Sequence, residues 1–83
     1  MAKMFDPHPG LAGCMVRIPE AVRLVANELD GQDVPIAEAV AKIQAACPGG
    51  EVKDSPNHGM ICLTVENFPG MQHSWRVIRY QEG

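Results

Sequence analysis

Aromatic residues are scarce in this chain, which has one Trp, one Tyr and two Phe in 83 residues. The hydrophobic core therefore has to consist mainly of aliphatic side chains and methionine. A chain of this length forms one domain and buries only about 60% of its extended surface. Hydrophobic residues still make up 46% of the sequence, which indicates a folded protein and not a disordered one. Such a small core leaves little surplus stability for strained catalytic geometry.

Several features of exported and membrane proteins are also missing. The three cysteines are an odd number, which does not suggest a disulfide framework. No apolar run approaches the roughly 20 residues that a membrane-spanning helix requires. The amino-terminal residues lack the charged segment followed by an apolar core that marks a secretory signal. The sequence therefore predicts a cytoplasmic protein that does not contact a membrane.

The chain has no large excess of charge, since its formal net charge is −3. This value argues against a dedicated nucleic-acid-binding protein with a basic surface. The acidic residues are concentrated in the predicted helical half, whereas Arg76 and Arg79 lie together on the last predicted strand. This asymmetry indicates a difference in surface charge between the two halves.

Motifs that would identify a reaction are absent as well. There is no P-loop and no dinucleotide-binding fingerprint, and Gly49-Gly50 follows a helical pattern where a phosphate site would precede one. Four residues could ligate zinc or supply a nucleophile and a base, but only His58 and Cys62 approach the usual ligand spacing. The sequence therefore predicts no metal, no cofactor, no catalytic residues and no enzymatic activity. The four residues are Cys47, His58, Cys62 and His73.

The clearest pattern present is a predicted β-hairpin over residues 59–80. From residue 60 to 66 apolar and polar residues alternate, which is typical of a half-buried strand. Phe68-Pro69-Gly70-Met71 fits a type II turn, with Pro at the second position and Gly at the third. In the second strand, residues 74–80, Trp75 and Val77 would share one face, with Ile78 and Tyr80 on the other. Either both faces of this strand are covered, or a β-bulge changes its register.

Two amphipathic helices are predicted before the hairpin. The first begins near Pro19 and ends at Asp30-Gly31, and the second follows a predicted N-cap at Asp33 and ends at Pro48. Each has apolar residues at helical spacing. The two stripes are Val22, Val25, Ala26 and Leu29 in the first helix, and Ile36, Ala39, Val40, Ile43 and Cys47 in the second.

The fold class that these patterns predict is α+β. We expect a two-helix hairpin packed on a small antiparallel sheet of two to four strands, in the order β-α-α-β-β, with a winged-helix-like arrangement as one form of it. Residues 14–18 are a candidate edge strand, and residues 51–53 a brief strand. Residues 1–13 are predicted to form a flexible N-terminal arm, and residues 14–83 a single domain.

The function that the sequence favours is protein binding without catalysis. Phe68, Met71 and Trp75 surround the predicted turn, where large apolar side chains either anchor a partner or fold back to close the core. We add Arg76 and Arg79 to the predicted partner-binding residues. An edge strand, residues 14–18 or 74–80, can also pair with a second copy to form a homodimer. Accessory proteins of phages and other mobile elements, such as inhibitors of host enzymes, have this general character.

The alternative function is DNA binding by a winged-helix-like protein. Residues 35–47 would form the recognition helix and residues 67–73 the tip of the wing, with a basic patch of Lys53, Arg76 and Arg79 on the sheet. The outward face of that helix has one base, Lys42, beside the acid Glu38, whereas phosphate contacts call for several Lys or Arg residues.

Overall fold

The structure is a computed structural model that describes residues 1–8 and 18–82, with Asn67 and Phe68 described only in their backbone. The described part forms one antiparallel sheet of five strands and two helices, which confirms the α+β class. The sheet has more strands than the predicted two to four, and its strand order is β2-β1-β5-β4-β3. The elements are β1 (Ala2–Phe5), α1 (Glu20–Leu29), β2 (Asp33–Val34), α2 (Ile36–Ala46), β3 (Glu51–Ser55), β4 (Met60–Phe68) and β5 (Met71–Glu82).

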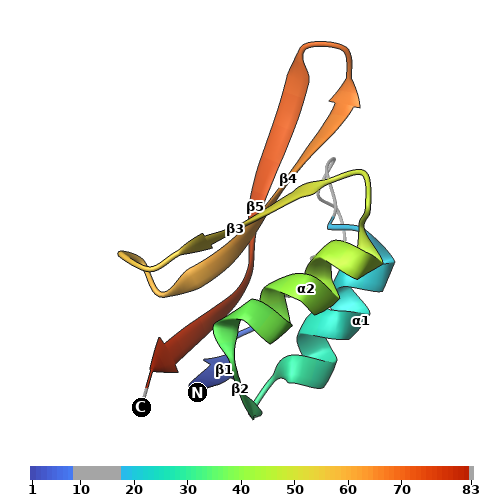
Figure 1. Ribbon diagram of the computed structural model, residues 1–83. Coiled ribbons are helices and arrows are strands. Elements are labelled where there is room, and N and C mark those ends of the chain that lie inside the picture. Colours follow the sequence, from blue (N-terminus) through green and yellow to red (C-terminus); the bar gives the residue numbers. More distant parts are fainter. Residues whose placement is uncertain (9–17, 83) are drawn as a thin grey trace.

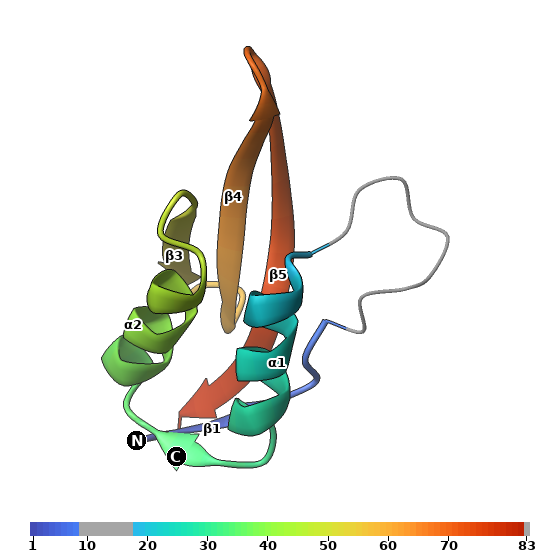
Figure 2. The same ribbon diagram turned by 90° about the vertical axis from the view of Figure 1, so that its right-hand side faces the viewer.

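Both helices lie on the same side of the sheet (Figures 1 and 2), and no helix of the described residues covers its other face. In α1 the predicted stripe faces the sheet, and Val22, Ala26 and Leu29 are buried. In α2 the buried positions are Ala39 and Ile43. Neither helix has the length and apolar character that a membrane crossing requires, within the ranges that the structure describes.

The predicted N-cap of the second helix is wrong. Pro35 occupies that position, and Asp33 lies in β2, where it pairs with Lys3 of β1. Backbone pairing with a strand distant in sequence therefore outweighs the local preference of Asp for a helix start.

Strand β1 is the main element that the sequence analysis did not predict. It lies inside the sheet between β2 and β5, and its Ala2 and Met4 side chains are buried. Met4 pairs directly with Tyr80, so both side chains point toward the helices. The candidate strand at 14–18 falls mostly on residues outside the described ranges, and Ile18, which is described, is buried but not in a strand.

A β-bulge in β5 resolves the two alternatives for that strand. Cys62 pairs with Arg76 and Ile61 pairs with Ile78, so Val77 is the extra residue on β5. Without a bulge, Trp75 and Ile78 would lie on opposite faces. Because of it, Trp75 shares a face with Ile78, and this face packs against the helices.

Strands β4 and β5 continue well past the ends of both helices (Figures 1 and 2). We call residues 65–75 of this hairpin the arm. Gly70 at its turn has a φ of +83°, as the predicted type II turn requires, and Phe68 pairs with Met71 across the turn.

Candidate partner-binding site

The strands of the arm pair only with each other among the described residues. On one side, β3 pairs with β4 no further than Thr64. On the other side, β1 pairs with β5 no further than Arg79, and the backbone N–H of His8 donates to the carbonyl of Val77. Within the described ranges, both strands of the arm therefore have an unpaired edge.

The face of the arm on the helix side carries the apolar side chains of Val65 and Met71. Met71 is 54% exposed, and its strand neighbours on that face are His73 and Trp75. The His73 and Trp75 rings stack with their centroids 6.2 Å apart. Trp75 is half-buried and packs against the core at the base of the arm, so it extends the core toward Met71. The side chain of Phe68, also predicted to bind a partner, lies outside the described part of the structure.

Arg76 and Arg79, the other predicted site residues, lie on the opposite face of the sheet. Arg76 Nη1 is 2.7 Å and Arg79 Nη1 3.8 Å from the same carboxylate oxygen of Asp6. The Arg79 guanidinium also lies over the Phe5 ring, 5.5 Å from its centroid. The structure thus separates the predicted site into two sets and engages the arginines in contacts with the amino-terminal segment.

Phe5 and Asp6 are not among the predicted site residues, because both precede the predicted domain. The signal available in sequence was weak, since a single Asp next to proline usually indicates a loop. The backbone of Asp6 has a φ of +54°, a left-handed conformation that Asp tolerates better than most residues. The two arginines thus contact the residue that follows β1.

The four residues considered for metal binding or nucleophilic catalysis are not brought together. Cys47 lies at the end of α2 on the core side, and Cys62 lies on the uncovered face of β4. His58 is in the turn between β3 and β4, whereas His73 is on the arm. Among the described residues no three His, Cys, Asp or Glu side chains form a metal-binding group.

Tyr80 forms a polar contact across the sheet. Its ring is buried in the core, and its hydroxyl donates a hydrogen bond to Asp54 of β3. Burial, followed by the hydrogen bond and the nearby negative charge of Asp54, raises the pKa of Tyr80 to about 12, from 10.0 for an unperturbed tyrosine. This contact connects β5 to the edge strand β3, with β4 between them.

We expect ionisation of the Tyr80 hydroxyl to lower the stability of the fold at high pH. Its folded-state pKa is raised, so its contribution is complete below pH 10 and is lost as the pH rises through about 12. Urea unfolding of the wild type and of Tyr80→Phe, measured at neutral pH and between pH 10 and about 12, gives the size of this loss. The variant should lose less stability than the wild type over the alkaline interval. Equal losses in both proteins would show that other groups cause the alkaline destabilisation.

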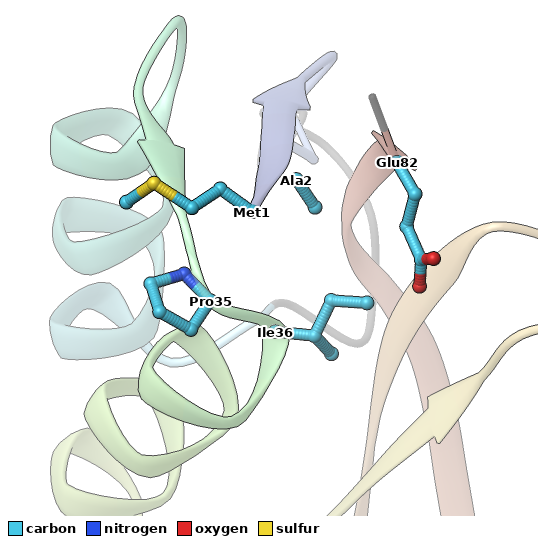
Figure 3. A pocket seen from close by; sticks show the side chains of 5 residues that line it. All are labelled: Met1, Ala2, Pro35, Ile36 and Glu82. Carbon is cyan, nitrogen blue, oxygen red and sulfur yellow. The ribbon is translucent and has the colours of Figure 1, made fainter.

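A cavity of about 290 Å³ lies at the end of the molecule opposite the arm. Figure 3 shows the five side chains that line it. Four of them are apolar, and Glu82 supplies the one carboxylate. The side chains of this lining do not include a pair of nucleophile and base. The five residues are Met1, Ala2, Pro35, Ile36 and Glu82.

Comparison of the chain with protein-family models, with curated proteins and with solved structures found no match.

Proposed function

We propose that this protein is a non-enzymatic binding module that occupies the surface of a protein partner with the helix-side face of its arm. The observation that carries the proposal is the position of Met71. This side chain is 54% exposed at the far end of the hairpin, which extends past the ends of α1 and α2. An apolar side chain that projects from the body of a protein is suited to fill a pocket on a partner.

The neighbours of Met71 support the same role. His73 and Trp75 lie on the same face as Met71, between it and the core. Their stacked rings would therefore hold the Met71 side chain in a fixed position. Tryptophan and methionine are enriched at protein interfaces. On the other face of the arm, Thr64 and Ser74 share a hydrogen bond of 2.8 Å between their hydroxyl oxygens. This contact helps to hold the two strands together at the base of the arm.

The alternative, DNA binding through α2 and the arm, has weaker support. Arg76 and Arg79 are engaged with Asp6, which leaves less positive charge for phosphate contacts. The exposed part of α2 carries Glu38 together with Lys42.

The proposal is tested by affinity capture from cells of the source organism with a tagged wild-type chain, followed by mass spectrometry. Met71→Ser should recover much less of the captured partner, because truncation of an anchor residue costs on the order of 1–2 kcal/mol of binding energy. Leu24→Ser is the matched control, because Leu24 on α1 is also a large apolar residue and is 50% exposed. This control should recover as much partner as the wild type. Equal recovery by Met71→Ser and the wild type would refute the proposal.

A further inference from the structure

The strand edges that have no pairing partner in the described part of the chain differ in charge. The outer edge strand β3 carries Glu51, Lys53 and Asp54, and charged side chains are a common protection against edge-to-edge association. At the other end of the sheet, β2 has only two residues. The β4 edge of the arm contains Glu66. The β5 edge of the arm has the sequence Met-Gln-His-Ser-Trp over residues 71–75, with no Lys, Arg, Asp, Glu or Pro.

From this contrast we infer that two copies of the chain associate through the β5 edges of their arms, residues 71–75, paired antiparallel about a two-fold axis at His73. The inference rests on the proposed function, since the paired arms would present one continuous sheet to the partner. An unpaired strand edge offers its backbone N–H and C=O groups to another strand. In a two-fold dimer the same edge is used by both copies.

The register about His73 matches the side chains. Met71 of one copy faces Trp75 of the other, on the same side of the joined sheet, and His73 faces its own copy between them. Side chains directly opposite each other in an antiparallel pair are in contact, and at contact a methionine sulfur and an aromatic ring attract each other. Gln72 faces Ser74 on the opposite side of the sheet. Each directly opposed pair is therefore apolar with apolar or polar with polar.

The same operation at β3 gives an unfavourable pairing. Antiparallel pairing of residues 51–55 about their centre would place Lys53 directly opposite its own copy, and like charges in that position are destabilising. The charge pattern therefore selects the arm edge over the β3 edge. Five paired residues bury less surface than the roughly 1,000 Å² of a stable interface, so we expect association that depends on protein concentration.

Sedimentation velocity of the purified chain, from micromolar to millimolar concentration, tests the inference. The mass should rise from 9.0 kDa toward twice that value. His73→Lys should remain monomeric, because it places two like charges opposite each other at the axis. His58→Lys is the matched control in the exposed turn between β3 and β4 and should still associate. Circular dichroism melting confirms that each variant is folded.

A mixing experiment tests the register. His73→Glu should also be monomeric alone, whereas an equimolar mixture of His73→Lys and His73→Glu should form heterodimers through opposite charges. A wild type that is monomeric at every concentration would overturn the inference, as would a His73→Lys chain that dimerises normally. Monomeric variants that fail to associate when mixed would overturn it as well. These measurements use the chain alone, so their failure leaves the partner-capture experiment unaffected.

Discussion

Leu63→Ala is expected to lower the free energy of unfolding by about 2–5 kcal/mol, which is typical of a leucine truncated in a well-packed core. Leu63 is fully buried and lies on β4, an inner strand of the sheet. A domain of this size has a total stability of roughly 4–12 kcal/mol, so the variant should lose a large fraction of it. Urea denaturation monitored by circular dichroism measures the change.

The control for this prediction is Leu24→Ala, which removes the same atoms from α1 at a side chain that is 50% exposed. Its effect should be within about 0.5 kcal/mol of the wild type, because surface substitutions usually stay in that range. Similar losses in the two variants would contradict the assignment of Leu63 to the core.

Gly50→Ala is expected to destabilise the protein by about 1–3 kcal/mol, through overpacking. A Cβ atom at this position would lie 2.6 Å from Leu63 Cδ1 and 3.3 Å from the carbonyl oxygen of Thr64. Leu63 cannot easily move away, because core side chains are close-packed. Gly49→Ala is the matched control, since a Cβ there would have no atom within 4 Å. Comparable losses in the two glycine variants would contradict the predicted clash.

The two substitutions should also be coupled. In the Leu63→Ala background the closest obstructing atom is gone, so Gly50→Ala should cost less there than in the wild type. The tight contacts of the new methyl group with Cys47 Sγ (3.1 Å) and the Thr64 carbonyl oxygen (3.3 Å) remain. A double-mutant cycle measures this interaction free energy directly. Additive effects would show that Gly50 and Leu63 do not meet as described.

The local signals in the sequence correctly predicted the two helices α1 and α2 and the hairpin of β4 and β5. The apolar stripes of α1 and α2, the alternation of β4 and the turn at Gly70 all depend on residues close in sequence. Strand β1 could not be found in this way, because Ala2 and Met4 become core residues only through pairing with Tyr80 and Glu82 at the other end of the chain. For β5 the sequence allowed either a strand covered on both faces or a β-bulge, and only the pairing of β5 with β4 shows that a bulge is present at Val77.

The candidate site was predictable to a smaller extent. The exposure of Met71 follows from its position beside a turn, and the sequence analysis singled it out for that reason. The structure places Arg76 and Arg79 on the face opposite Met71. Arg76 lies there because strand positions alternate between faces, and Arg79 lies there because the bulge at Val77 shifts the alternation by one residue. The contact of both arginines with Asp6 spans nearly the whole chain, and no local pattern indicates it.

Recognition of a protein partner through the exposed end of the arm is the central proposal for this protein. Calorimetric titration of the captured partner, once purified, with the Met71→Ser and Leu24→Ser chains tests that claim most directly. We predict an affinity about tenfold weaker for Met71→Ser, which corresponds to about 1.4 kcal/mol, and no change for Leu24→Ser. Equal affinities of the two variants, or a larger loss for Leu24→Ser, would contradict it.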